Sequence, residues 1–310
     1  MPPDGLKRPA YSVIVPAYNE SAHLEDLYRR LKNVFKSLPG AHEIILIDDG
    51  STDRTWQMIQ AFHEQDSSIV GIRMMRNFGQ QAAWRAGFEA ARGEIVVTLD
   101  ADLQNPPEEI PRLLAKLDEG YDVVSGVRKA RQDSALRRLS SWCVNKMVSR
   151  MIGFPLHDIG CALRVHRRQV VDAFLKFEEK FQYFPAIFGM ITHRIAELPV
   201  DHEPRRSGKS HYPWTLLLRL TLNLVTGHSH WIAPLFLAAG CLTALGAAAI
   251  GVLLCNGALL EAQSWMVLLF AAYLILLTVY WYFLGEYLVR IYRNSQRRPD
   301  YLIREELRRG

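Results

Sequence analysis

The chain has 310 residues, a length that allows one large domain with an appendage or two small domains. Lys and Arg outnumber Asp and Glu by 37 to 32, and the net charge of +5 is too small an excess to indicate a nucleic-acid-binding protein. The four cysteines include no Cys-x-x-Cys pair, which argues against a disulfide framework and against a zinc site. The first ten residues, MPPDGLKRPA, lack the apolar core of a signal peptide, so we expect the first domain to stay in the cytoplasm.

Residues 1–212 alternate short apolar, β-branched runs with longer amphipathic runs. This pattern is typical of βα units in a mostly parallel sheet, so we expect an α/β domain here. The expected strands are Tyr11–Val15, Glu43–Ile47, Ile69–Met74, Glu94–Leu99 and Asp122–Gly126. The expected helices are residues 20–37, 53–65, 80–91 and 107–119, the last with prolines and acidic residues in its first turn.

Two later runs, Trp231–Leu254 and Ser264–Gly285, contain no charged residue. Each is long enough to cross a hydrocarbon core of about 30 Å at about 1.5 Å per residue, although buried helices of a soluble protein are the alternative. Lys and Arg flank the pair on both sides and are missing from the connection at residues 256–263, so the positive-inside rule places both flanks in the cytoplasm. We therefore expect an amphipathic interface helix at 213–230, two transmembrane helices within 231–289, and a basic cytoplasmic tail at 290–310.

Polar groups follow three of the expected strands. The strongest set is Leu99-Asp100-Ala101-Asp102-Leu103-Gln104, where two acids alternate at the end of an apolar strand. Hard oxygen ligands suit Mg²⁺ or Mn²⁺, which would bridge a diphosphate, while a solvated turn with capping acids is the alternative for this short motif alone. The first strand ends in residues 16–20 and the second in residues 48–51, both polar, so together the three ends predict a nucleotide crevice at one edge of the sheet.

Some neighbouring residues carry weaker signals. Asp48 either caps the turn after its strand or contacts a ligand, and Gln80 either starts a helix or lies near the diphosphate. The three arginines within residues 164–168 are expected to form a solvated face, and His166 is expected to be structural because it has no metal-like spacing.

Several longer motifs together resemble the glycosyltransferase family 2 enzymes with a GT-A fold. These motifs are VPAYNE at 15–20, IDDGSTD at 47–53, RNFGQQAA at 76–83, LDADLQNPPEEIPRL at 99–113, GYDVVSGVR at 120–128 and DIGCALRVHRR at 158–168. Within that family the chain is most similar to the polyprenyl-phosphate glycosyltransferases, which include dolichyl-phosphate mannose synthases. The run from Leu99 through Ser134 looks closest to undecaprenyl-phosphate 4-deoxy-4-formamido-L-arabinose transferases.

The resemblance implies roles for individual residues. The positions that match the binding site for the base and ribose are Pro16, Tyr18, Glu20 and Asp49. Those that match the metal and diphosphate site are Asp100, Asp102 and Gln104. The positions that match the acceptor-phosphate site are Arg128, Arg137 and Ser141. Residues 205–210 match a mobile loop in which Lys209 would help to neutralise phosphate, and Asp158 matches an acid often suggested as the catalytic base.

The base role of Asp158 is open to a physical objection. A phosphate monoester has a second pKa of about 6, so at neutral pH it is largely ionised and has no proton to lose before it attacks. The reaction needs charge management instead, and arginines provide forked donors for the acceptor phosphate. We therefore expect Asp158 to position an arginine or a sugar hydroxyl, and we expect a single displacement with inversion, as the family implies.

The resemblance implies a multi-pass protein of the inner (cytoplasmic) membrane that transfers sugar from UDP-4-deoxy-4-formamido-L-arabinose to undecaprenyl phosphate, for lipid A or other envelope glycan modification. The alternative is a polyprenyl-phosphate glucose or mannose synthase that uses UDP-glucose or GDP-mannose. A processive polysaccharide synthase would carry a QxxRW motif, which the sequence lacks, and a non-catalytic sensor would have lost acids that are present here. We also expect a homo-oligomer, a tetramer as in related enzymes, because two spans make a thin bundle and several glycines offer close-packing faces.

Overall fold

A computed structural model describes residues 8–128, 146, 149, 158, 160–177, 184–203, 238–246, 263–296 and 299–309. The chain divides into two compact units. The first contains Met1–His211 together with Pro299–Gly310, and the second contains Tyr212–Arg298. The end of the chain therefore belongs to the same unit as the N-terminal domain.

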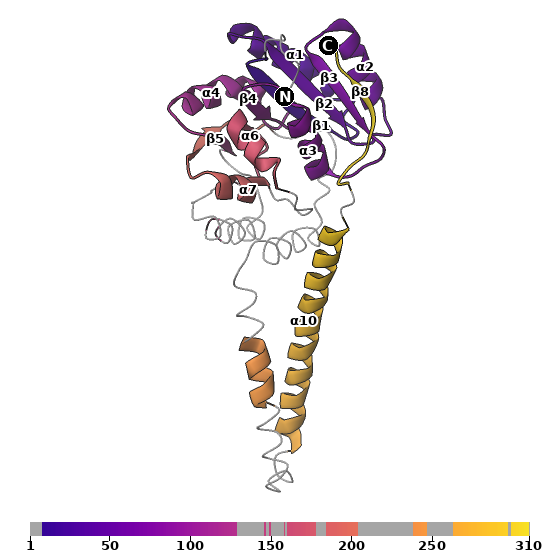
Figure 1. Ribbon diagram of the computed structural model, residues 1–310, viewed down its shortest axis with the longest axis vertical. Helices are drawn as coiled ribbons and strands as arrows, with labels where there is room; N and C mark the ends of the chain where they lie inside the picture. The colour runs from indigo at the N-terminus through magenta and orange to yellow at the C-terminus, as the bar shows by residue number, and fades with distance from the viewer. Residues whose placement is uncertain are drawn as a thin grey trace. The chain divides into compact units, whose positions relative to one another are not determined.

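The first unit is built on an eight-stranded mixed sheet with the order β7-β5-β6-β4-β1-β2-β3-β8 (Figure 1). Its strands are β1 (Tyr11–Ala17), β2 (His42–Asp48), β3 (Ile69–Met74), β4 (Ile95–Thr98), β5 (Val123–Arg128), β6 (Arg164–Arg167), β7 (Ile195–Val200) and β8 (Ile303–Leu307). Its helices are α1 (Leu24–Ser37), α2 (Thr55–Gln65), α3 (Gln80–Ala90), η1 (Pro107–Glu109), α4 (Ile110–Asp118), α6 (Arg168–Phe174) and α7 (Phe184–Ile191). Only β6 and β8 pair antiparallel to their neighbours, so the carboxyl ends of β1 to β5 and β7 lie along one edge.

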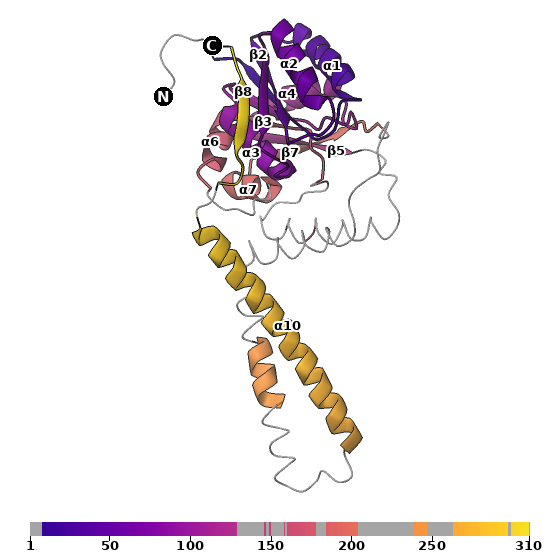
Figure 2. The same cartoon turned by 90° about the vertical axis from the view of Figure 1, so that its right-hand side faces the viewer.

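Helices cover both faces of this sheet, and the alternation of side chains along each strand supplies a core on either side. Val13 and Val15 of β1 belong to the core beneath α1, α2 and α4. On the other face, Ile14 lies so close to Gly87 of α3 that any side chain at Gly87 would overlap it. Phe88 of α3 packs there against aromatic rings of α6 and α7, and Figure 2 shows the same division of the helices.

The five predicted strands are confirmed to within two residues at their ends, whereas two predicted helices differ from the structure. The helix predicted over residues 20–37 begins at Leu24, because residues 20–23 form a turn in which the Glu20 N–H donates to Thr55 Oγ1 at 3.0 Å. The helix predicted over residues 107–119 starts as the 3-10 turn η1 and continues as α4. Pro111 causes this break, because it has no N–H to donate to the carbonyl of Pro107.

The predicted solvated face around residues 164–168 is wrong. These residues form β6 and the start of α6, and β6 lies between β4 and β5 in the middle of the sheet. Arg167 donates to the carbonyl of Leu117 at 3.0 Å, and Arg168 donates to the carbonyl of Gly93 at 3.1 Å. The guanidinium groups therefore satisfy backbone carbonyls at the ends of other elements.

The C-terminal residues close the other end of the sheet. β8 pairs antiparallel with β3, and the Met75 N–H donates to the carbonyl of Leu302 at 2.9 Å. Arg308 lies 3.1 Å from the carboxylate of Glu43, which is almost fully buried at the start of β2. The basic tail predicted for residues 290–310 therefore contains a strand that the sequence pattern did not indicate.

The second unit contains the long helix α10 (Gln263–Ser295). Its segment Ala272–Val289 has a mean hydropathy of 1.4, and none of the segment is buried within the molecule. By length and composition this is the one helix among the described residues that could cross a membrane. Of the other predicted span only residues 238–246 are described, and they are helical, while the predicted interface helix at 213–230 lies outside the described residues.

Candidate active site

The predicted crevice lies where β1, β2, β4, β5 and β7 end at the same edge of the sheet. Two loops at this edge have unusual backbone geometry. Asn19 follows β1 with φ of 55°, and Leu103 follows β4 with φ of 60°; they are the two non-glycine residues with positive φ in the described part of the chain. Such a conformation is strained for leucine, and strained residues gather at functional sites because surrounding contacts hold them there.

The β1 and β2 ends are joined by hydrogen bonds through their loops. The Asn19 N–H donates to Ser51 Oγ at 2.9 Å, and the Thr52 N–H donates to Asn19 Oδ1 at 2.8 Å. Pro16 lies at the end of β1, and the Tyr18 side chain is 46% exposed beyond it. The Tyr18 ring is therefore open to contact with a ligand at this edge of the sheet.

Asp48 and Asp49 hold the backbone of this edge. Asp48 Oδ1 accepts the Ser51 N–H at 2.9 Å, which is the turn-capping role considered for it. Asp49 accepts the N–H groups of Phe78 and Gly79 at 2.7 and 2.9 Å, one on each oxygen. Burial raises the pKa of Asp49 and these two N–H groups oppose that rise, so the carboxylate orders the turn before α3. A nucleotide-binding role for Asp49 remains a prediction.

The residues 99–104 form an acidic loop after β4. Gln80 Nε2 donates to Asp100 Oδ1 at 2.7 Å, and the Gln104 N–H donates to Asp102 Oδ1 at 3.1 Å. Burial and then the nearby charge of Asp102 raise the pKa of Asp100 to about 7, although Gln80 acts in the opposite direction. Among the described residues, the loop therefore crowds two carboxylates without enough positive charge to balance them. Gln80 is the first residue of α3, which is the first of its two alternatives, and its side chain also reaches Asp100. A place for Gln80 near a diphosphate stays a prediction.

Arg128, at the end of β5, is paired with a residue of opposite charge, unlike the two carboxylates of the acidic loop. Its Nε and Nη2 donate to the two oxygens of Asp158 at 2.7 and 2.8 Å, and its backbone N–H adds a third bond at 3.1 Å. Asp158 is almost fully buried. A side chain on Gly160 would come within 2.8 Å of Arg128 Nη2, so this glycine leaves room for the pair. The expected positioning contact between Asp158 and an arginine is present.

His202 was not predicted, and it follows β7 at the same edge. Burial and the charge of Arg128 lower its pKa, while Asp102 and Asp158 act to raise it, so the imidazole lies among both charged sets. Its Nδ1 is buried and has no hydrogen-bond partner in the described part of the chain. Recognising residues 195–200 as a strand parallel to the others would have pointed to His202.

The remaining predicted site residues are Arg137, Ser141 and Lys209, and they lie outside the described residues. Among the rest, the charges of Glu20, Asp102 and Arg128 all act on Asp100, so residues from β1, β4 and β5 are brought together. The Glu20 carboxylate also lies 2.7 Å from His23 Nδ1. The amide N–H of Gln104 supports the acidic loop, and its carbonyl accepts the Glu203 N–H at 2.9 Å.

A model of glycosyl transferase family 2 matches residues 12–175, a stretch that runs from β1 past the end of α6. The chain belongs to glycosyl transferase family 2. The acidic loop, the Arg128–Asp158 pair and the β1 and β2 ends all lie within the matched residues, whereas His202 and β8 lie beyond them.

Solved structures support the same fold for this family 2 chain. Glucosyl-3-phosphoglycerate synthase from Mycobacterium tuberculosis, solved with Mn²⁺, UDP-glucose and phosphoglyceric acid, has a TM-score of 0.52 at 19% identity, over 70% of this chain and 79% of that one. Mannosyl-3-phosphoglycerate synthase from Rubrobacter xylanophilus has a TM-score of 0.53 at 14% identity, over 70% of this chain and 72% of that one. The mixed α/β sheet is therefore GT-A-like.

Proposed function

We propose that this family 2 chain transfers a sugar from a nucleotide-sugar to a polyprenyl phosphate at a membrane, with a divalent cation. The observation that carries the proposal is the pairing of two opposite charge environments at one sheet edge. The acidic loop offers carboxylates whose charge the described residues do not balance, and Arg128 offers a guanidinium held by Asp158 at the same edge. One environment suits a cation with a diphosphate, and the other suits an acceptor phosphate.

The donor set of the acidic loop fits Mg²⁺ or Mn²⁺. Both cations prefer oxygen ligands, and a cation held by Asp100 and Asp102 would offset the burial and the repulsion that together raise the pKa of Asp100. Gln104 adds a side-chain carbonyl in the same loop. When bound, the cation would neutralise charge on the leaving diphosphate. The M. tuberculosis neighbour was solved with Mn²⁺ and UDP-glucose together, which agrees with this assignment.

Different residues of the chain would bind the nucleoside, the diphosphate and the acceptor phosphate. Tyr18 and the β1 and β2 ends would bind the nucleoside, and the acidic loop would orient the diphosphate. Asp158 holds the Arg128 guanidinium in one orientation at the end of β5. We assign this guanidinium to the acceptor phosphate, together with Arg137 and Ser141, and Lys209 would add positive charge. An ionised phosphate needs no base, and its oxygen would bond to the anomeric carbon while the bond from that carbon to the nucleoside diphosphate breaks. Inversion in this single displacement is what the family resemblance implies.

The acceptor class is the finer part of the proposal. The neighbours act on phosphoglycerate, a soluble acceptor that also carries a phosphate. The apolar, unburied segment Ala272–Val289 favours a lipid acceptor for this chain instead, and the sequence resemblance favours undecaprenyl phosphate with UDP-4-deoxy-4-formamido-L-arabinose. UDP-glucose and GDP-mannose are the alternative donors. We place the enzyme in the inner membrane with its first unit in the cytoplasm, as a homo-oligomer whose expected tetramer can be measured by light scattering in detergent.

A transfer assay in detergent tests the proposal. The full chain is given undecaprenyl phosphate or 3-phosphoglycerate, a panel of UDP- and GDP-sugars, and Mg²⁺, Mn²⁺ or EDTA. We expect metal-dependent transfer to the lipid from one donor, and a loss of about a thousandfold in Asp102→Asn, since a metal site contributes several kcal/mol to a transition state. Glu64→Gln, an exposed acid on α2, is the matched control.

Two outcomes would contradict the proposal. Transfer to 3-phosphoglycerate but not to the lipid would overturn the acceptor assignment and leave the glycosyltransferase assignment in place. Transfer that is unchanged in EDTA and in Asp102→Asn would overturn the metal site.

A further inference from the structure

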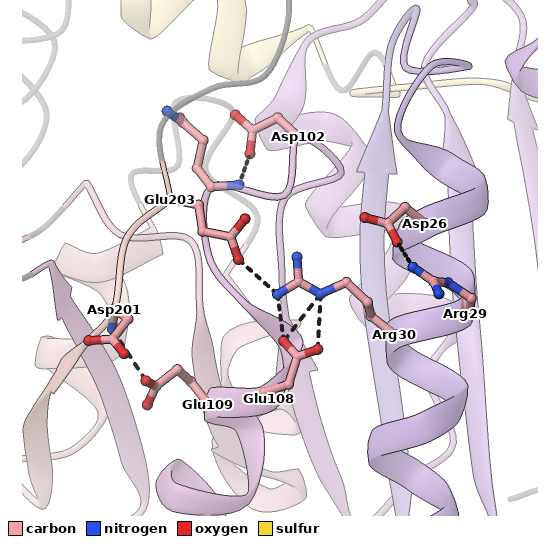
Figure 3. Close-up of polar contacts among 9 residues, drawn as sticks. Asp26, Arg29, Arg30, Asp102, Glu108, Glu109, Asp201 and Glu203 are labelled. Carbon is pink, nitrogen blue, oxygen red and sulfur yellow. Dashed lines mark hydrogen bonds and ion pairs between the residues drawn. The ribbon is translucent and has the colours of Figure 1, made fainter.

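Residues 201–203 form a short strap between the end of β7 and the acidic loop. The Glu203 N–H donates to the Gln104 carbonyl at 2.9 Å. The Asp201 N–H donates to Glu109 Oε1 at 3.3 Å (Figure 3). His202, between these two contacts, is the residue that lies among Asp102, Asp158 and Arg128. The strap therefore runs beside the acidic loop and carries a residue into the site.

One guanidinium group joins the strap to two other elements. Arg30 of α1 donates to Glu108 through Nε at 2.9 Å and Nη2 at 2.7 Å, and its Nη2 also donates to Glu203 Oε1 at 2.9 Å. The Arg30 side chain is only 15% exposed, although its two partners are more open. Glu108 and then Glu203 raise the pKa of Arg30, and Arg30 in turn lowers the pKa of Glu108.

The helix that carries Arg30 is a rigid platform. Leu27 and Leu31, which flank Arg30 on α1, are fully buried in the core beneath the sheet. Glu108 lies in η1, four residues after the end of the acidic loop. Arg30 therefore ties both sides of the site, the loop with its acids and the strap with His202, to one well-packed helix.

We propose that Arg30 is a positioning residue for sugar transfer, because it holds Glu108 and Glu203 together and so fixes the strap against the acidic loop. The consequence is a fixed place for His202 beside the acidic loop and the Arg128–Asp158 pair, where the donor and acceptor phosphates must meet. This inference rests on the proposed function. Small displacements of groups that orient two substrates lower rates by about a hundredfold, even when the displaced residue touches neither substrate.

The same helix offers a matched control. Arg29 pairs with Asp26, three residues earlier on the same helix, at 2.5 Å, and its side chain is 72% exposed (Figure 3). Arg30→Met and Arg29→Met remove the same charge from adjacent positions and keep a long apolar side chain at each. We expect Arg30→Met to lower kcat/KM for the sugar donor by about tenfold to a hundredfold, and Arg29→Met to change it by less than about twofold.

A second variant separates positioning from general stability. Glu203→Gln removes the charge that Arg30 holds on the strap, so its loss in kcat/KM and the loss in Arg30→Met should not multiply in the double variant. Hydrogen exchange at the Glu203 amide should speed up by about tenfold in Arg30→Met but not in Arg29→Met, since the bond to Gln104 loosens. A merely structural role would lower the melting temperature while the folded enzyme kept its kcat/KM.

The proposal is overturned if Arg30→Met and Arg29→Met have equal kcat/KM, if the Arg30 and Glu203 losses multiply, or if Glu203 exchange is unchanged. The exchange measurement needs no substrate. If the wild-type chain transfers no sugar at all, the proposed function fails by itself, and the Glu203 amide still decides whether Arg30 holds the strap.

Discussion

The two halves of the site differ in how their charge is balanced. At the acidic loop, Asp100 and Asp102 lie close together and the pKa of Asp100 rises to about 7. At the end of β5, Asp158 faces a group of opposite charge, Arg128, and accepts two hydrogen bonds from its guanidinium and one from its backbone N–H. The first half is unbalanced within the protein, and the second half is balanced.

This difference indicates that the carboxylates of the acidic loop face a charged ligand, whereas Asp158 supports Arg128. A carboxylate pair that raises a pKa lowers the stability of the folded chain, so it persists where a bound cation offsets it. The buried salt bridge from Asp158, in contrast, keeps the Arg128 side chain in one orientation. Variants on the two sides should therefore change activity in the same direction and stability in opposite directions.

The largest effect is expected from Asp100→Asn. It should reduce sugar transfer by about a thousandfold, because it removes a charge that would bind the cation. It should also raise the stability of the metal-free protein by about 1 kcal/mol at pH 7.5, because the cost of burying the Asp100 charge and its repulsion from Asp102 are both lost, while solvent already screens part of them. Transfer assays and thermal unfolding in EDTA measure the two quantities. A melting temperature below that of wild type would contradict the claim that the carboxylates of the acidic loop destabilise the metal-free protein.

Asp158→Asn should have a smaller effect on transfer and the opposite effect on stability. Transfer should fall by about a hundredfold, because Arg128 loses the charge that orients it. Stability should fall by about 2 kcal/mol, because a mostly buried guanidinium keeps only part of its hydrogen bonding. The matched control is Asp118→Asn, an exposed acid at the end of α4. Stability equal to wild type would show that the Arg128–Asp158 pair does not stabilise the fold.

His166→Leu is expected to have no effect on transfer. It tests how a buried polar group outside the site affects stability. Burial, and then Arg164, lower the pKa of His166 to about 3, and neither ring nitrogen has a partner among the described residues. The unfolded chain therefore binds a proton below about pH 6.5 that the folded chain refuses, and the stability lost by pH 5 is about 2 kcal/mol.

His166→Leu should remove that share of the acid sensitivity and leave transfer at pH 7.5 unchanged. Urea unfolding at pH 7.5 and pH 5 measures the difference between the two proteins. Equal losses of stability in wild type and variant on going to pH 5 would mean that other groups cause the acid sensitivity.

The part of the fold that the sequence predicted is the part with simple hydrophobic patterns. β1 to β5 have apolar runs, because neighbouring strands and helices cover both of their faces. β6 has the sequence RVHR and β8 has IREEL, and neither looks like a strand. Arg167 of β6 donates to carbonyls outside the sheet, and β8 is an exposed edge. Such strands depend on tertiary contacts that no local pattern records.

The site was predictable to the same extent. Asp100 and Asp102 follow a clear strand, so their place at the sheet edge could be predicted. His202 and Arg30 could not, because His202 follows an unrecognised strand and Arg30 meets Glu203 across 173 positions of chain. Local charge on α1 gave no sign of this, since Arg29 and Arg30 are adjacent and only the packing of Leu27 and Leu31 turns one of them inward.

The pairing of β8 with β3 also constrains how the molecule is made. Arg308 and Glu43 are 265 positions apart, and the long helix α10 is synthesised between them. While the ribosome is still translating α10, the outer edge of β3 has no partner and exposes a row of backbone N–H and C=O groups. The sheet can be completed only when the last residues emerge, so a nascent chain stalled before Ile303 should be prone to aggregation even though its catalytic half is already complete.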